Sequence, residues 1–229
     1  TGSDIQDGTA NALASSVTSA SVTIDNTAPT LSIGAPSVST TASGPVSYTV
    51  TYTGADTVNL VQGDITLNTT GTATGTVAVT NGTTATPTVT ISTTTGDGTL
   101  GITIASATAS DTAGNTALGA GPSSTFIVDN TAPTVVSIVP TTTGPTNATT
   151  MDFTVTFSED MGSFDSHGRS FSGITTGTST ISGGPKIFNI NVPTIAGDGT
   201  LFVQVYPHFS VYDLAGNPLS NSLNSATVT

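Results

Sequence analysis

The sequence predicts an all-β protein that consists of two tandem β-sandwich units, preceded by one strand of an upstream repeat. Composition, an internal repeat and a period-two alternation of apolar residues each support this prediction. The 229 residues include 51 Thr and 25 Gly, but only two Lys or Arg. Because Thr favours strands and Gly breaks helices, this composition argues against helical and α/β folds.

An internal repeat sets the domain organisation. Three motifs recur in the same order, with offsets of 101 to 104 residues. The motif pairs are Asp-Asn-Thr-Ala-Pro-Thr at 25–30 and 129–134, Gly-Asp-Gly-Thr-Leu at 96–100 and 197–201, and Asp-x-Ala-Gly-Asn at 111–115 and 213–217. A shared order with nearly constant offsets indicates repeated structural units. We therefore expect one unit at residues 25–128 and a second at residues 129–229.

Residues 1–24 match the end of such a unit. Asp7 precedes Asp25 by 18 residues, as Asp111 precedes Asp129 by 18. We expect this segment to be the last strand of a truncated upstream repeat, in a mature chain or a fragment of a longer protein. The alternative is a donor strand that pairs with another copy of the chain, since a strand needs partners for its backbone groups.

Period-two alternation identifies the strands of the first unit. Residues 46–53 place four apolar or aromatic side chains on one face, Val46, Tyr48, Val50 and Tyr52, and hydroxyl groups on the other. Further strands are expected at Val89–Ile91, Leu100–Ile104 and Phe126–Val128. Clusters of turn residues, such as Asn81-Gly82, separate them.

The second unit repeats this pattern. Its matching stretch places Met151, Phe153, Val155 and Phe157 inward, and further strands are expected at Phe188–Val192, Leu201–Val205 and near Ala226–Val228. About seven short strands in about 100 residues, with polar outer faces, are typical of an immunoglobulin-like sandwich. The Cys and Trp of antibody cores are absent, so this expectation concerns the architecture alone.

The three repeated motifs, in this order, resemble the bacterial immunoglobulin-like repeats of large secreted surface proteins. Residues 155–160, Val-Thr-Phe-Ser-Glu-Asp, resemble the second strand of those repeats and the loop after it. The resemblance covers residues 1–229. It implies an extracellular, cell-surface location and a stalk in which neighbouring repeats of one adhesin present a distal region. Several similar families bind Ca²⁺ at the joints between repeats, so the resemblance also implies Ca²⁺ as a cofactor.

The acidic residues supply candidate ligands for that ion. Asp accounts for 13 of the 14 acids, and nearly all lie in expected loops. At the joint between the units the candidates are Asp97, Asp129, Glu159, Asp160 and Asp213, and at the joint before the first unit they are Asp25, Asp56 and Asp111. Ca²⁺ takes six to eight oxygen ligands, which suits such a convergence. The alternative is that each Asp caps a turn through its own backbone.

The two joints are not expected to bind calcium equally. The first unit has Gly54-Ala55 where the second has Glu159-Asp160. The segment between this point and the later strands also differs in length between the two units.

Composition also excludes several classes of function. Two cations cannot neutralise a run of phosphates, so we expect no nucleic-acid partner. No apolar run reaches the roughly 20 residues of a membrane span, so no membrane insertion is expected. The chain has no Cys, only His167 and His208 as histidines and only Lys186 as a lysine. Because no nucleophile motif or zinc-ligand spacing accompanies them, we predict a protein without enzymatic activity.

Two functions follow from these observations. The first is a structural stalk module of a secreted bacterial cell-surface adhesin, stiffened by calcium at its joints. The second is a self-assembling subunit of an extracellular filament or surface lattice, in which residues 1–24 add a strand to another copy. Whether that segment pairs with a second chain distinguishes the two.

Overall fold

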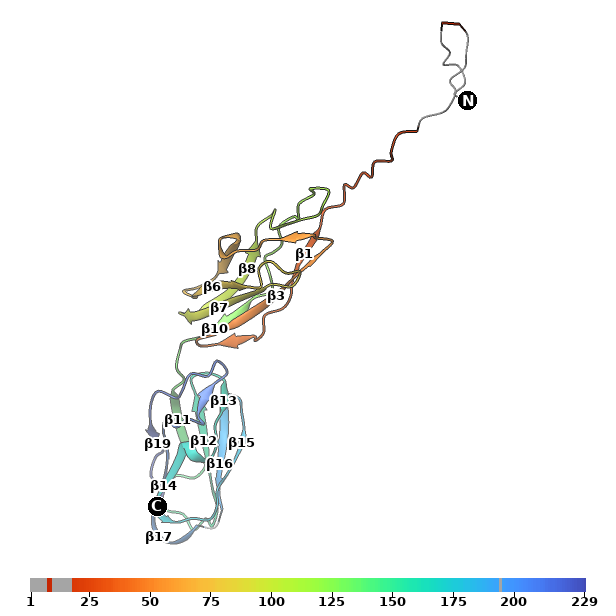
Figure 1. The fold of residues 1–229 in the computed structure, drawn as a ribbon. Helices are drawn as coiled ribbons and strands as arrows, with labels where there is room; N and C mark the ends of the chain where they lie inside the picture. Colours follow the sequence, from red (N-terminus) through yellow and green to blue (C-terminus); the bar gives the residue numbers. More distant parts are fainter. Residues whose placement is uncertain (1–7, 10–17, 194) are drawn as a thin grey trace.

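The structure is a computed structural model that describes residues 8–9, 18–193 and 195–229 (Figure 1). The described residues form β-strands and two single-turn 3₁₀ helices, which confirms the predicted all-β fold class. In this part of the chain, no helix has the length and apolar character needed to cross a membrane. The strands gather into two bodies that lie end to end, and residues 18–24 lead away from the first of them (Figure 1).

Residues 25–128, here the first unit, form two four-stranded sheets. One sheet has the order β1 (Thr30–Ile33), β3 (Val46–Thr53), β7 (Thr88–Thr95), β6 (Thr74–Thr80). The other has the order β2 (Thr40–Thr41), β10 (Phe126–Val128), β8 (Gly98–Ile104), β5 (Ile65–Thr69). A small pair, β4 (Thr57–Val58) with β9 (Ala109–Ser110), and the helical turn η1 (Gln62–Asp64) complete the unit. The pairing of β10 with β2 is parallel, and the other pairings are antiparallel.

Residues 129–229, here the second unit, repeat this arrangement. One sheet has the order β11 (Val135–Pro140), β12 (Met151–Phe157), β16 (Ile187–Val192), β15 (Thr180–Gly183). The other has the order β14 (Arg169–Thr175), β17 (Ala196–Val205), β19 (Leu223–Asn224). The pair β13 (Met161–Ser163) with β18 (Tyr212–Asp213) and the turn η2 (Ser166–Gly168) lie outside these sheets.

The strand order of both units is that of an immunoglobulin-like sandwich. When the main strands of the first unit are lettered A to G along the chain, β1-β3-β7-β6 reads A-B-E-D and β5-β8-β10 reads C-F-G. In the second unit β11-β12-β16-β15 and β14-β17-β19 read the same way. Sheets ABED and CFG are the two layers of this fold, so the architecture follows from the topology alone.

Each unit has its own hydrophobic core between its sheets. The buried apolar residues form two separate clusters, one within residues 46–128 and the other within residues 135–228. In β3, Val46, Tyr48 and Val50 are fully buried while their neighbours are partly exposed, as the alternation predicts. Tyr48 also donates its hydroxyl to the carbonyl of Ser124, 2.9 Å away, so this buried polar group is satisfied.

Two expectations about strands need correction. The last strand of the second unit was expected near Ala226–Val228, but the strand is β19 at Leu223–Asn224, and Val228 makes only an isolated bridge with Leu201. The hydroxyl of Ser225 accepts the N–H of Val203 in place of a backbone carbonyl, at 3.0 Å, and this interrupts the ladder.

The described part of the opening segment, residues 18–24, is also not a strand in this structure. Within the described residues it has no strand beside it, and β-structure requires such a partner. Val22 and Ile24 are therefore 84% and 80% exposed. The remainder of the expected strand, residues 1–7 and 10–17, lies outside the described residues.

Candidate metal centre at the joint between the units

The linker between the units is a short turn built by its own polar residues. β10 ends at Val128 and β11 begins at Val135. Between them, the carboxylate of Asp129 accepts the backbone N–H of Thr131 at 3.0 Å, which closes an Asx turn. The repeated Asp-Asn-Thr motif therefore shapes the linker.

The first unit holds the linker through Asp97, in the turn between β7 and β8. Its carboxylate accepts the N–H of Asn130 at 2.7 Å and the hydroxyl of Thr131 at 3.0 Å. Asn130 in turn donates its side-chain amide to the carbonyl of Ala42. Gly98 follows Asp97 at a φ of 149°, and a Cβ there would lie 2.0 Å from the carbonyl oxygen of Thr70. Glycine is therefore required for this turn to approach its neighbour.

The second unit holds the linker through the Asp-x-Ala-Gly-Asn motif. The buried carboxylate of Asp213 accepts the N–H groups of Ala215 and Asn217 and the side-chain amide of Asn217, each at 2.8 Å. The same amide donates to the carbonyl of Asp129, also at 2.8 Å. Across the joint, the N–H of Ala42 donates to the carbonyl of Ala215 at 3.1 Å. Both units therefore bond to the linker and to each other.

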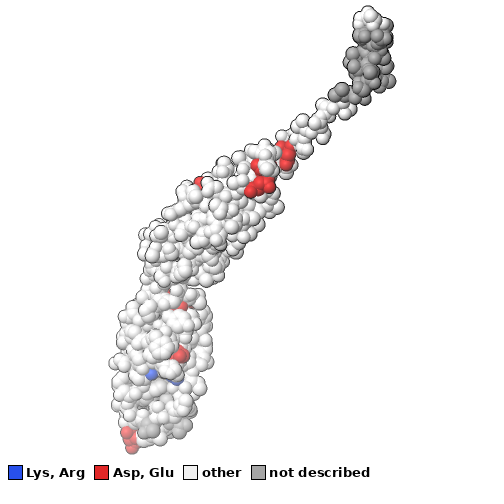
Figure 2. Space-filling view, in the orientation of Figure 1, with Lys and Arg blue, Asp and Glu red and all other residues white. Residues whose placement is uncertain are grey.

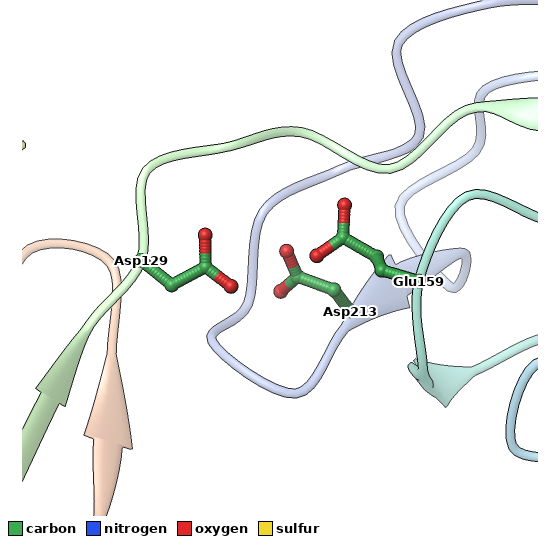
Figure 3. A group of neighbouring side chains, drawn as sticks. All are labelled: Asp129, Glu159 and Asp213. Carbon is green, nitrogen blue, oxygen red and sulfur yellow. The ribbon is translucent and has the colours of Figure 1, made fainter. Parts of the chain in front are cut away.

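Three carboxylates converge beside this linker. Asp129, Glu159 and Asp213 each place one oxygen within 4.8 Å of the others. Figure 3 shows them pointing toward one another from the linker, from the loop after β12 and from β18. Two oxygens that bind one Ca²⁺ at about 2.3–2.6 Å can lie at most about 5 Å apart, so the spacing suits a shared ion.

The electrostatics of the cluster also favour a cation. The pKa of Glu159 is raised, first by burial and then by the negative charges of Asp129 and Asp213. Three carboxylates held this close repel one another, and a bound cation would relieve the repulsion. All the side-chain ligands are oxygens, which suits Ca²⁺ rather than zinc. Because three carboxylates fill only part of a six- to eight-ligand shell, backbone carbonyls or water would supply the rest.

The remaining candidates at this joint have other positions. Asp97 is outside the group of three, and its carboxylate is engaged with the linker. Asp160 is exposed and is also outside the group. The structure therefore brings together three of the five acids expected here.

The joint before the first unit has the same hydrogen-bonded turns, but its described residues form no group of three close carboxylates. Asp111 accepts the N–H and the side-chain amide of Asn115, both at 2.8 Å, as Asp213 does with Asn217. The Asn115 amide lowers the pKa of Asp111. Asp25 accepts the N–H of Thr27 at 2.9 Å, and Asp56 accepts the N–H and hydroxyl of Thr112.

Asp25, Asp56 and Asp111 line a cavity of about 360 Å³. All three are described, but their carboxylate oxygens do not all lie within 4.8 Å of one another, as those of Asp129, Glu159 and Asp213 do. Gly54-Ala55 stands where the second unit has Glu159-Asp160, so the first unit has no carboxylate at the position of Glu159. The two joints therefore differ in how their acids are grouped, and unequal calcium binding stays a prediction.

One polar cluster was not anticipated from the sequence. The hydroxyl of Ser210 donates to Asp165 at 2.7 Å and lies 2.8 Å from Nδ1 of His208. The hydrogen bond from Ser210 is the main reason that the pKa of Asp165 falls to about 2. His167 stacks on His208 with ring centroids 5.5 Å apart. More than forty residues separate Asp165 from Ser210, so no local sequence pattern predicts this contact.

The order of groups in this cluster differs from a hydrolytic triad. In a triad, the imidazole lies between the serine and the carboxylate and removes the serine proton. Here Ser210 lies between, and its proton is directed to Asp165. The contacts of Ser210 therefore join the loop that holds Asp165 to the loop that holds His208.

Comparisons with known proteins add little to this description. No protein-family model matches the chain, and no curated protein matches it. One similar solved structure is a chimeric titin Z1Z2 functionalized with a KLER exogenous peptide from decorin, at 12% identity and a TM-score of 0.32, with 86% of this chain and 94% of that chain covered. At that TM-score the likeness carries no argument, and the fold assignment rests on the strand order.

Proposed function

We propose that the chain is a structural stalk module of a secreted bacterial cell-surface adhesin, in which two immunoglobulin-like units are held in line by their joint. The observation that carries the proposal is the joint itself. Asp97 of the first unit and Asn217 of the second both bond to the linker, and three carboxylates meet beside it. The resemblance of the repeated motifs to surface-protein repeats supports the location.

In this proposal the joint is stiffened by Ca²⁺ bound to Asp129, Glu159 and Asp213. These ligands come from the linker, from the loop after β12 and from strand β18 of the second unit. An ion shared by them restrains the linker against that unit, while Asp97 restrains it against the first. The work of the module is mechanical, and we propose no catalytic activity.

Thermal unfolding with and without calcium tests the metal site. We expect millimolar Ca²⁺ to raise the melting temperature relative to EDTA, since a ligand that binds only the folded state stabilises it by mass action. Glu159→Gln keeps the shape of the side chain but removes one ligand charge, so most of the calcium response should disappear. Asp160→Asn removes the same charge from the adjacent residue, which lies outside the cluster, and should respond like the wild type.

Two outcomes would contradict a calcium site at Asp129, Glu159 and Asp213. Identical melting curves of the wild type in Ca²⁺ and EDTA would show that the three carboxylates do not bind the ion. A full calcium response in Glu159→Gln would show that it binds elsewhere.

A further inference from the structure

The second unit has an open cavity on its side, between β14 and β15, the edge strands of its two sheets. The cavity measures about 410 Å³, which is within the usual size range of small-molecule sites. Residues of β14, of the turn η2 before it and of β15 contribute to the lining. They differ from the residues that bond to the linker or form the carboxylate cluster, so the cavity is separate from the joint.

A buried cation lies in the wall of this cavity. Arg169, the first residue of β14, is only 7% exposed. Its Nη2 donates to the carbonyl oxygen of Ser179 at 3.0 Å and to the hydroxyl of Ser179 at 2.7 Å. Its Nε is buried and has no hydrogen-bond partner. Among the described residues, no Asp or Glu forms an ion pair with this guanidinium.

Burial without an acidic partner is unfavourable for a guanidinium. Burial lowers the pKa of Arg169, and the negative charge of Asp165 opposes that change only in part. The carboxylate of Asp165 instead accepts the N–H of His167 and the hydroxyl of Ser210. An anion in the cavity would therefore supply the partner that Arg169 lacks.

The first unit shows that the fold does not require this cation. The repeated Gly-Asp-Gly-Thr-Leu motif aligns β8 with β17, so Ile104 and Val205 are equivalent. Ile65 pairs with Ile104 and Arg169 pairs with Val205, which makes Ile65 the counterpart of Arg169. Ile65 packs against the core of its unit. An apolar residue therefore serves the architecture at this position, and the buried charge is an addition of the second unit.

The rest of the lining suits a sugar ring. Three serines and Asp165 are its other polar side chains, and its apolar part includes Phe164, Ile181 and Phe188. A sugar ring carries hydroxyl groups at its edge and C–H groups on its faces, so it can use both kinds of surface. A carboxylate on the ring would form charge-assisted hydrogen bonds with the guanidinium, which are about twice as strong as neutral ones.

The charge of the chain favours a ligand with a single negative charge. The sequence has a net charge of −12 and only two cations, Arg169 and Lys186, and Lys186 is outside the lining. One guanidinium can neutralise one carboxylate. A ligand with several phosphate or sulfate groups would bring charges that find no cation here and are repelled by the acidic molecule.

We propose that the cavity beside Arg169 binds an acidic sugar, a hexuronic acid or a similar ring that carries one carboxylate. The carboxylate pairs with the guanidinium of Arg169, and the sugar hydroxyls bond to the serines and to Asp165. The second unit then contacts acidic glycans through its side. This binding goes beyond the stalk function and does not depend on calcium.

An NMR titration of the ¹⁵N-labelled chain with glucuronate in EDTA tests the proposal separately from the calcium site. We expect saturable shifts of the amide signals of residues 164–169 and 179–183. Glucose lacks the carboxylate and acetate lacks the ring, so each should bind at least about tenfold more weakly than glucuronate.

Two variants alter the cavity in different ways. Arg169→Ile introduces the residue of the first unit. Replacing a buried charge by an apolar residue is often neutral or stabilising, so this variant should be at least as stable as the wild type, while its affinity for glucuronate falls at least about tenfold. Ser182→Leu keeps the guanidinium but fills part of the cavity, so it should also weaken binding.

Lys186→Gln is the matched control, because it removes the other positive charge from a residue outside the lining and should bind glucuronate like the wild type. Absence of saturable shifts with glucuronate would overturn the proposal, and so would equal binding of glucose or acetate. An unchanged affinity in Arg169→Ile or in Ser182→Leu would place the binding elsewhere and would overturn it too.

Discussion

Glu159 is the residue in which the two joints differ most. Asp129 and Asp213 have counterparts in Asp25 and Asp111, and both pairs accept backbone N–H groups in the same way. Such bonds stabilise an ionised carboxylate with or without a metal. Glu159 instead has a raised pKa, because burial and its acidic neighbours oppose its charge. A cation at the cluster therefore acts mainly on this residue.

The raised pKa of Glu159 predicts a pH dependence whose sign depends on calcium. Without a cation, the folded state holds the Glu159 proton more tightly than the unfolded chain does. Stability attributable to this residue is thus gained as pH falls through the raised pKa. In EDTA we expect Glu159→Gln to be more stable than the wild type at pH 7, by a margin that shrinks as pH approaches 4.5.

Urea unfolding of both chains across this pH range measures the margin. In Ca²⁺ the order at pH 7 should reverse, because the ionised carboxylate then binds the metal. A margin in EDTA that does not change with pH would contradict the electrostatic account of Glu159.

At the scale of the elements, long alternating stretches were predictable and short ones were not. The burial of β12 alternates along its whole length, as the sequence indicates. β6 has no fully buried residue. Only Val77 and Val79 pack partly against the core, so its Thr-rich sequence carries a weaker pattern than that of β12. The two-residue strands β4 and β9 are too short for any periodicity. They are ordered by tertiary contacts, which composition does not reveal.

The candidate site was predictable to a similar extent. Motif order indicated that acids from the linker and neighbouring loops meet at the joint. It did not separate Glu159 from Asp160, because adjacent residues in a loop point in directions that depend on the backbone. It also did not show that the carboxylate of Asp97 is engaged by Asn130 and Thr131, since that contact depends on the folded joint.

The separation of the two cores predicts that a core substitution acts on one unit. Phe153 in β12 is fully buried within the cluster of the second unit. We expect Phe153→Ala to lower the free energy of unfolding of that unit by about 3–5 kcal/mol. The unfolding temperature of the first unit should not change. Differential scanning calorimetry resolves the unfolding transitions of the two units.

Val139→Ala is the control within the neighbouring strand β11. Val139 is 54% exposed, so the change should cost no more than about 0.5 kcal/mol. A single transition that shifts as a whole in Phe153→Ala would contradict independent cores.

At the scale of the molecule, the two units form an elongated body with a sparsely charged surface. Figure 2 shows a face that is almost free of Lys and Arg, with acidic side chains in a few small groups. The net charge of −12 arises from only 16 charged residues in 229. Spacing between units therefore depends on the joint rather than on long-range repulsion, which salt screens beyond about 10 Å.

The most direct test of a calcium-stiffened stalk is a distance distribution between the two units. The chain has no Cys, so Val61→Cys and Ile187→Cys, one exposed position in each unit, accept spin labels specifically. We predict that Ca²⁺ narrows the distribution relative to EDTA, and that Glu159→Gln abolishes the narrowing while Asp160→Asn does not. Equal widths in Ca²⁺ and EDTA would contradict the account.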